Sequence, residues 1–377
     1  MTLPHVIEWL IKGFVWAMIL LGGFAYLTLY ERKVLAWMQS RIGPNRAGPW
    51  GILQPIADAV KLIFKEELTP ANADKLIFLL APVITVVPAV VITAVVPFGP
   101  SFDIFGYHVD LYIADINIGV LYIMSVASIA VYGIVLAGWS SNNKYAMLGG
   151  LRSTAQMISY EIALGLSFVS AVILAGSMNM LEIVNVQGGY WFHFIPKWFV
   201  VLQPVGTAIF LIATLAEVNR APFDMPEAEQ ELTAGYHTEY SGMKFALLFM
   251  AEYTKMIAIS AIGATVFFGG YNGPFIDRFP WLGPIYVFVK IIILLFGMIW
   301  VRATFPRIRY DRLMAFGWKV LLPLSLALIF ITAMCILLAQ QVNALLLWAI
   351  PVVSLLVGLA AIALVYRTLR RKEYARA

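Results

Sequence analysis

The chain has 377 residues, of which 61% are hydrophobic and 12% are charged, about half the charged fraction of a soluble domain. This composition excludes a soluble globular enzyme and predicts a polytopic membrane protein. The net charge of +5 comes from bases that stand beside apolar runs, so nucleic-acid binding is not expected.

Few residues suit a metal, a haem or a nucleotide. The single cysteine, Cys335, lies in an apolar run, which leaves no disulfide framework and no cysteine cluster for zinc or iron–sulfur. The four histidines, His5, His108, His193 and His237, lie outside the apolar runs. Haem held between transmembrane helices is therefore not expected. The sequence contains no glycine-rich nucleotide loop of Walker or Rossmann spacing. Any redox chemistry therefore needs electrons from another subunit.

Nine runs are long and apolar enough to cross about 30 Å of hydrocarbon as helices. They begin near Gly13, Leu76, Ile116, Ser153, Phe199, Phe245, Ile285, Val320 and Ala344. The predicted fold class is all-α: one polytopic membrane domain over residues 1–377, with nine transmembrane helices and one interfacial amphipathic helix. The first run, 13–30, lacks a small-residue cleavage site and leads directly into a charged triplet, so we expect a retained span.

Basic residues are unevenly distributed over the loops. They follow the first, third, seventh and last runs, whereas the alternate loops have almost none. The basic residues after these four runs are Arg32, Lys33, Arg41, Arg46, Lys61, Lys65, Lys144, Arg152, Arg302, Arg307, Arg309, Arg312, Arg367, Arg370, Arg371 and Lys372. The positive-inside rule then places the N-terminus outside and the C-terminus in the cytoplasm. All loops are short, so no soluble catalytic domain is expected.

Residues 51–66 show a helical pattern that is too short to span a bilayer. The apolar stripe consists of Ile52, Leu53, Ile56, Val60, Ile63 and Phe64, and the polar face of Gln54, Asp58, Lys61 and Lys65. We expect this helix to lie along the membrane interface. It is either a surface anchor or the roof of a cavity entered from the bilayer, with Asp58 and Lys61 facing inward.

Two spans carry a carboxylate within the membrane. In the fourth, Glu161 belongs to a half-helix with polar residues on opposite faces, which predicts that this half is packed in protein or lines a wet cavity. In the sixth, Lys255 follows Glu252 by three residues, so the two can meet on one helix face. Such carboxylates are typical of ion or proton paths, with a purely structural hydrogen bond or ion pair as the alternative.

The segment 217–240, before the sixth span, is the most acidic of the chain. Against one arginine, Arg220, it holds six of the 21 acidic residues: Glu217, Asp224, Glu227, Glu229, Glu231 and Glu239. Apolar residues such as Phe223 and Tyr236 interrupt it, which favours a folded-in segment over an ordinary solvated acidic surface. Crowded carboxylates hold protons more tightly, so we expect this segment and the intramembrane acids to form a proton relay.

Five sequence motifs are distinctive enough to be compared with known protein families. They are residues 31–33 (Glu-Arg-Lys), 41–49 (Arg-Ile-Gly-Pro-Asn-Arg-Ala-Gly-Pro), 53–66, 151–161 and 217–240. Together they resemble the H-subunit family of NADH:quinone oxidoreductase, respiratory complex I, from residue 31 to about 318. The resemblance implies a proton-translocating membrane subunit of the respiratory chain. Such a subunit has no redox centre of its own and forms most of a quinone (ubiquinone) tunnel with two peripheral subunits.

By position, the resemblance assigns the proton path to Glu161, Glu217, Asp224, Glu227, Glu229, Glu231 and Glu252, and the quinone tunnel to Arg32, Asp58 and Lys61. It assigns no residue to a metal. Tyr236-His237 stands where several members read Phe-Asn, which adds a side chain that can titrate near neutral pH. The ninth span, about 344–366, and the basic tail exceed the eight-span members, and only packing or partner contact is expected of them.

The resemblance also implies the surroundings of the chain. Quinone is the expected substrate, no cofactor is bound by this chain alone, and FMN and iron–sulfur clusters are expected in partner subunits. The expected partners are the peripheral subunits with the terminal iron–sulfur cluster and the quinone headgroup site, antiporter-like membrane subunits and the lipid bilayer, in the bacterial inner (plasma) membrane. Two alternatives remain: a membrane subunit of a related energy-converting hydrogenase, or a free-standing proton-coupled transporter, although no inverted repeat is evident.

Overall fold

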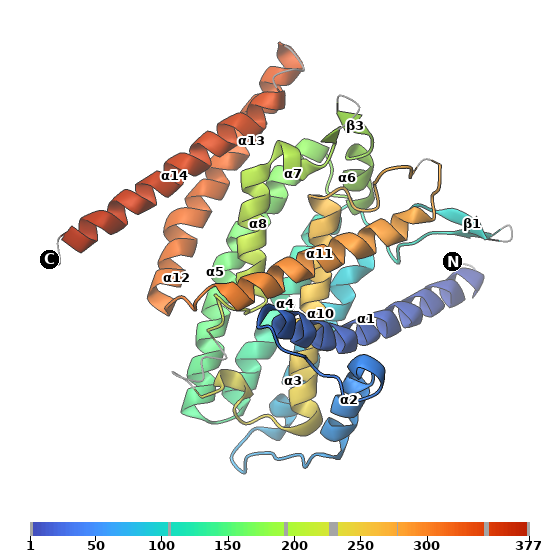
Figure 1. Ribbon diagram of the computed structural model, residues 1–377, viewed down its shortest axis with the longest axis vertical. Helices are drawn as coiled ribbons and strands as arrows, with labels where there is room; N and C mark the ends of the chain where they lie inside the picture. Colours follow the sequence, from blue (N-terminus) through green and yellow to red (C-terminus); the bar gives the residue numbers. More distant parts are fainter. Residues whose placement is uncertain are drawn as a thin grey trace.

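Long helices dominate the fold (Figure 1). The computed structural model describes residues 3–104, 107–191, 195–225, 233–276, 278–342 and 347–374. In this part of the chain, eight helices are long and apolar enough to cross a bilayer, and one shorter apolar helix accompanies them. The prediction of an all-α polytopic membrane protein is confirmed.

The long helices are α1 (Leu3–Met38), α3 (Lys75–Val91), α4 (Gly119–Ser140), α5 (Lys144–Ala175), α10 (Gly242–Val266), α11 (Leu282–Thr304), α13 (Leu322–Gln341) and α14 (Ala349–Tyr374). The short ones are α2 (Gln54–Phe64), α6 (Met180–Val186), α7 (Phe199–Leu202), α8 (Pro204–Glu217) and α12 (Tyr310–Phe316). They are joined by the single-turn 3-10 helices η1 (Pro49–Gly51), η2 (Ile92–Val95) and η3 (Gly235–His237) and by the π-helix η4 (Gly317–Leu321). Two antiparallel hairpins pair β1 (Phe102–Ile104) with β2 (Tyr107–Val109), and β3 (Tyr190–Trp191) with β4 (Ile195–Pro196). In Figure 1 the short elements that connect the long helices lie at two opposite ends of the bundle, with α6 and β3 near one end and α2 near the other.

The first helix is longer than its apolar run. α1 does not end at Tyr30 but continues to Met38, so the charged triplet that begins at Glu31 is helical and not part of a loop. The amphipathic helix is shorter than the range 51–66. α2 has 11 residues because Pro55 stands in its first turn and Gly51 before it has a left-handed φ of 78°. The apolar side chains of α2, such as Ile56 and Phe64, are exposed.

The fifth expected span is a short, enclosed helix. α8 has 14 residues, about 21 Å at 1.5 Å per residue, and packs against α5, α13 and α14. At its start the buried Gln203 side chain donates hydrogen bonds to Ser170 O and Thr332 Oγ1, both at 3.1 Å. α8 ends at Glu217, so the short helix leaves that carboxylate inside the protein.

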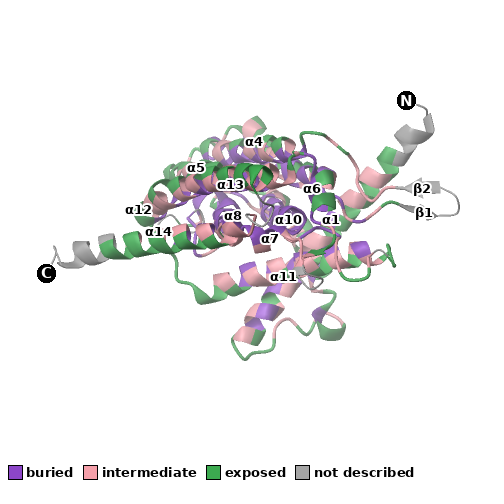
Figure 2. Cartoon of the chain, turned by 90° about the horizontal axis from the view of Figure 1, so that it is seen from above, coloured by how far each residue is buried: buried purple, intermediate pink, exposed green. Residues whose placement is uncertain are grey.

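The centre of the bundle is formed by α8 and α10, where buried residues concentrate (Figure 2). α10 packs against α1, α3 and α11, and most of its residues are buried. The outer helices instead expose large apolar side chains such as Phe14, Phe330 and Ile362. An apolar exterior around a polar interior is the arrangement that a lipid solvent favours.

Small residues allow α4, α5 and the η3 turn to approach closely. A Cβ atom added to Gly138 of α4 would lie 2.8 Å from Ala146 O, and one added to Gly149 of α5 would lie 2.5 Å from Gly235 Cα. Glycine is therefore required at both contacts. The second contact fixes η3 against α5, and with it the positions of Tyr236 and His237.

We expect Gly149→Ala to lower the stability of the protein by about 1–3 kcal/mol, because backbone on both sides of the contact has to move. The control is Gly165→Ala on the same helix, whose added Cβ would lie 3.3 Å from the flexible end of Met124. Unfolding midpoints in an SDS titration of the detergent-solubilised protein measure both changes. Equal midpoints for the two variants would show that this contact does not fix η3.

Candidate functional site

A cluster of ionisable side chains lies between α1, α8, α10, α11 and the segment after α8. Glu31 of α1 is buried, and Arg302 of α11 donates a hydrogen bond to its Oε1. The buried Arg220 approaches the same oxygen, with Nη1 at 3.7 Å. Isolated charges in such a place are costly, so each of these three side chains depends on the others for compensation.

Glu252 of α10 is the point where the cluster meets the η3 turn. Tyr236 donates its hydroxyl hydrogen to Glu252 Oε1 at 2.8 Å, and His237 Nε2 lies 3.5 Å from the same oxygen. Arg220 Nη2 lies 3.9 Å from Glu252 Oε2, and the Arg220 guanidinium lies 4.3 Å from the centre of the Tyr253 ring. Arg220 thus joins two carboxylates from two helices, Glu31 and Glu252.

Lys255 pairs with a different carboxylate from the one its spacing suggests. Its Nζ donates to Glu217 Oε1 at 2.7 Å, whereas the spacing on α10 also allowed a pair with Glu252. The reason is tertiary: η3 and Arg220 occupy Glu252, while the end of α8 brings Glu217 to Lys255. A cavity of about 20 Å³ lies among Glu217, Glu252, Lys255 and Asn219, enough for about one water molecule.

Glu161 continues this line of carboxylates into α5. Ser128 of α4 donates its hydroxyl hydrogen to Glu161, and the charge of Glu161 acts on Glu217. The polar half of α5 is packed in protein, as predicted. The buried Gln156 Nε2 donates to Phe223 O at 2.6 Å and to Ala216 O at 2.9 Å, which holds the segment after α8 against α5.

The acidic segment is folded in where the structure describes it. Phe223, Met225 and Tyr236 are buried, which confirms that apolar residues anchor it. Asp224 accepts a hydrogen bond from Arg307 Nη2 at 2.9 Å, whereas Glu239 accepts one from Asn143 Nδ2 at 2.6 Å, away from the cluster. Three acids assigned to the proton path lie outside the described residues: Glu227, Glu229 and Glu231.

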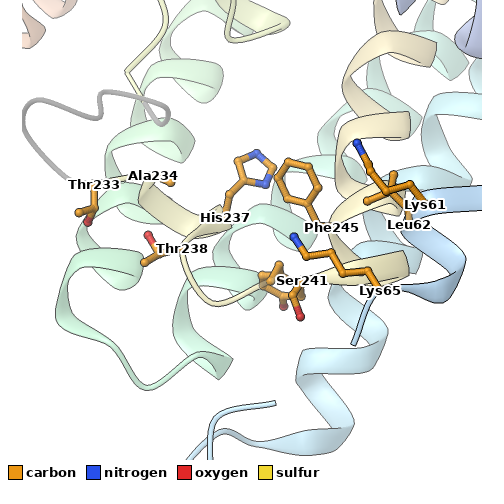
Figure 3. Close-up of a pocket in the computed structure, with 11 residues that line it drawn as sticks. Lys61, Leu62, Lys65, Thr233, Ala234, His237, Thr238, Ser241 and Phe245 are labelled. Carbon is orange, nitrogen blue, oxygen red and sulfur yellow. The ribbon is translucent and has the colours of Figure 1, made fainter. Parts of the chain in front are cut away.

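The three residues assigned to a quinone tunnel lie on α1 and α2. Arg32 Nη1 donates to Asp58 Oδ2 at 2.8 Å, and Lys61 Nζ lies 3.6 Å from Asp58 Oδ1. Lys61 of α2 and Lys65, the residue that follows this helix, line a pocket of about 640 Å³, opposite His237 and Phe245 (Figure 3). Asp58 is therefore turned toward α1, and Lys61 toward the pocket.

The pocket reaches the buried cluster through His237. This side chain lines the pocket, is 5% exposed, and lies beside Glu252 on its Nε2 side. Its Nδ1 is buried without a hydrogen-bond partner among the described residues. Burial raises the pKa of Tyr240, which also lines the pocket, to about 12, although a hydrogen bond with Ser140 acts the other way. Tyr240 thus stays a neutral donor.

His237 was singled out from the sequence as a titratable side chain, but sequence reasoning assigned no functional role to four other residues of this site: Glu31, Arg220, Arg302 and Tyr236. A signal existed for Glu31, because a charged triplet interrupts an otherwise apolar helix, and for Arg220, the only base of the acidic segment. The pairing of Glu31 with Arg302 joins residues 271 positions apart, which no local pattern reports. Among the described residues, no group of three or more histidine, cysteine, aspartate and glutamate side chains is arranged to hold a metal ion.

Fold and site together define a multi-pass membrane protein with a buried chain of carboxylates at one end of its helices. Residues 11–333 match the family model described as NADH dehydrogenase. Over 325 residues the chain is 51% identical to the H subunit of NADH-quinone oxidoreductase from Thermomicrobium roseum. This alignment covers 85% of this chain and 94% of that protein.

Two further relatives carry the same description. The first of the numbered H subunits of Geobacter metallireducens is 50% identical over 308 residues (82% of this chain, 90% of that protein). The H subunit of Protochlamydia amoebophila is 50% identical over 309 residues (82% and 91%). The chain belongs to the NADH dehydrogenase family, beside these H subunits of NADH-quinone oxidoreductase, and is thereby a subunit of an oxidoreductase complex. The match ends within α13, so α14 lies beyond it.

The Glu217–Lys255 pair allows a direct test of the cluster. Glu217→Gln or Lys255→Met alone leaves one buried charge without its partner, so each is expected to cost about 3–5 kcal/mol of stability. The double variant removes both charges and is expected to lose much less than the sum. A double-mutant cycle from SDS unfolding measures the difference, and strictly additive losses would contradict the pairing.

Proposed function

We propose that this chain is the membrane subunit of a proton-translocating NADH:quinone oxidoreductase, in which it forms the quinone tunnel with peripheral subunits and begins a carboxylate proton relay. The observation that supports this most is the unbroken series from the Lys61 pocket through His237 to Glu252. The 20 Å³ cavity then leads to Glu217, and the charge of Glu217 interacts with that of Glu161. Substrate chemistry at one end can therefore act on protons at the other.

The quinone side of the proposal rests on α1, α2 and α10. A quinone enters from the bilayer and passes Arg32, Asp58 and Lys61, whose charges orient its polar headgroup. Reduction to the quinol takes two electrons and two protons. The electrons come from an iron–sulfur cluster of a partner subunit, with FMN also in the peripheral partners. The protons have to pass side chains that can donate them.

The relay side follows from the charge balance of the cluster. Glu31, Glu217 and Glu252 are matched by Arg220, Arg302 and Lys255, and Glu161 adds a fourth carboxylate. The cluster therefore carries one negative charge in excess unless one carboxylate binds a proton. Negative charge that develops on the quinone favours that protonation. Reoxidation or quinol release favours its loss toward the antiporter-like membrane subunits.

The free energy of such pKa shifts is comparable to the cost of moving a charge against the membrane potential. A shift of one pKa unit corresponds to about 1.4 kcal/mol, and moving one charge against 100 mV costs about 2.3 kcal/mol. Several coupled shifts among Glu161, Glu217 and Glu252 are of the order that translocation needs. Asp224 and the acids Glu227, Glu229 and Glu231 would extend the path toward the peripheral subunit with the terminal cluster.

The relatives favour this function over the two alternatives. All those compared above are called H subunits of NADH-quinone oxidoreductase, which supports a quinone as the substrate and a multisubunit partner set. A hydrogenase subunit would need no quinone path, and a free-standing transporter would work without peripheral subunits. The assembled complex distinguishes the three, because only the first couples quinone reduction to proton movement.

Replacing Glu161 by glutamine in the assembled complex is expected to spare electron entry, measured with an artificial acceptor, and to reduce quinone-linked proton pumping at least about tenfold, since glutamine cannot carry the proton. The matched control is Glu182→Gln in α6, an exposed residue outside the cluster. Pumping and quinone turnover are followed with a pH-sensitive dye in proteoliposomes. Unchanged pumping in the Glu161 variant would remove this residue from the relay.

The proposed orientation has the N-terminus outside the bacterial inner membrane and the C-terminus in the cytoplasm. In a Cys335→Ser background, a membrane-impermeant maleimide added to intact cells is expected to label Ser101→Cys but not Ala71→Cys. Both positions are exposed, and they lie in connections predicted to face opposite sides. Permeabilisation should make Ala71→Cys reactive. The reverse pattern would invert the orientation and place the cluster on the wrong side for a cytoplasmic partner.

A further inference from the structure

A polar recess lies at the end of the bundle where α3 and α5 begin and α4 ends. It has a volume of about 490 Å³ and is formed by residues 70–72 before α3, residues 141–144 between α4 and α5, and Glu239 after η3. No residue lines both this recess and the Lys61 pocket, so the two are separate. Neither the quinone path nor the relay uses the recess.

Hydrogen bonds fix the walls of the recess. Asn143 Oδ1 accepts from Tyr145 N at 2.9 Å and thereby caps α5, while Asn143 Nδ2 donates to Glu239 Oε1 at 2.6 Å. Asn142, with a left-handed φ of 48°, donates from Nδ2 to Asn72 O at 3.3 Å. The recess is therefore preformed, and a group that enters it loses little free energy to reorganisation of the walls.

Glu239 gives the recess a carboxylate that the described part of the chain does not neutralise. Its Oε1 is held by Asn143, and no described cation forms an ion pair with it. Lys144 is the one base among the described lining residues, and its Nζ lies over the Tyr145 ring, 5.1 Å from the ring centre. A half-buried carboxylate with an amide partner and no ion pair favours a cation from outside the chain.

The beginning of α5 extends beyond the hydrocarbon. α5 has 32 residues, about 48 Å at 1.5 Å per residue, against about 30 Å of hydrocarbon. Lys144 and Arg152 are near its start, whereas no charged residue of α5 follows Glu161, so the excess length lies at the start. The exposed side chains of Tyr145 and Leu148 therefore face the aqueous side. Exposed apolar side chains beside a polar recess are typical of a protein–protein contact.

Glu239 belongs to the same turn as the residues that contact Glu252. Tyr240 N donates to His237 O at 3.1 Å, which closes the chain around Glu239. Tyr236 and His237 both approach Glu252 Oε1 from this turn. A cation bound at Glu239 would therefore hold the turn that presents these two side chains to the buried cluster.

We propose that the recess is the docking site for a basic side chain, arginine or lysine, of a soluble partner subunit. This side chain forms an ion pair with Glu239 Oε2, and the partner surface around it covers the apolar side chains at the start of α5. Docking thereby fixes η3 in the position that Glu252 needs. The inference rests on the proposed cytoplasmic placement of this end, which maleimide labelling decides separately, and does not need the quinone chemistry.

Glu239→Gln tests the ion pair, because glutamine keeps an acceptor for Asn143 and removes only the charge. In the purified complex, held by a tag on this chain, the soluble subunits are expected to dissociate about tenfold faster, which corresponds to about 1.4 kcal/mol. The difference from the wild type should shrink as added salt screens the pair, which a merely structural effect would not do. The matched control is Glu66→Gln, an exposed acid that does not line the recess, and its rate should stay unchanged.

Equal dissociation rates for the wild type and Glu239→Gln, or a difference that salt leaves unchanged, would overturn the inference. Should the Glu239 variant not assemble, a photoreactive amino acid at the exposed Asn142 decides in an otherwise wild-type complex. Crosslinks to a soluble subunit, at a segment that carries an arginine or lysine, support the site. Crosslinks confined to membrane subunits or lipid contradict it.

Maleimide labelling gives an independent measure of the same contact. In the Cys335→Ser background, Ala71→Cys at the rim of the recess is expected to react several-fold more slowly in the assembled complex than after salt has removed the soluble subunits. Equal rates of labelling would show that no soluble partner covers the recess.

Discussion

The structure depends on the mutual compensation of charges that are buried together. Each of Glu31, Glu217 and Glu252 would be costly alone in this interior, and each lies beside a cation from another part of the chain. Arg220 has the central place because it approaches two carboxylates that belong to α1 and α10. Helix packing therefore brings the charges together, and removal of any one of them leaves its partner uncompensated in the interior.

Uncharged contacts outside the cluster determine where its charged side chains lie. Tyr236 and His237 reach Glu252 only because η3 rests against α5 at Gly149, and the segment after α8 stays in place because Gln156 holds its carbonyl groups. These contacts are small, local and uncharged. They nevertheless determine which carboxylate faces the pocket and which faces α8.

Much of the fold could be predicted from the sequence, because a lipid solvent requires long apolar runs and makes every intramembrane acid conspicuous. Glu161 and Glu252 stood out for that reason. The partners of these acids could not be predicted in the same way. Lys255 is three residues from Glu252 yet pairs with Glu217, and Glu31 pairs with an arginine 271 residues away. Spacing reports the face of one helix, whereas pairing is decided by which helices meet.

The short α8 has an electrical consequence. A transmembrane voltage falls mainly across material of low dielectric constant, and α8 ends in such material, at the buried Glu217, about 21 Å from the start of the helix. A proton that reaches or leaves Glu217 therefore crosses part of the membrane potential. The fraction of time that this carboxylate holds a proton then responds to the voltage itself as well as to the neighbouring charges.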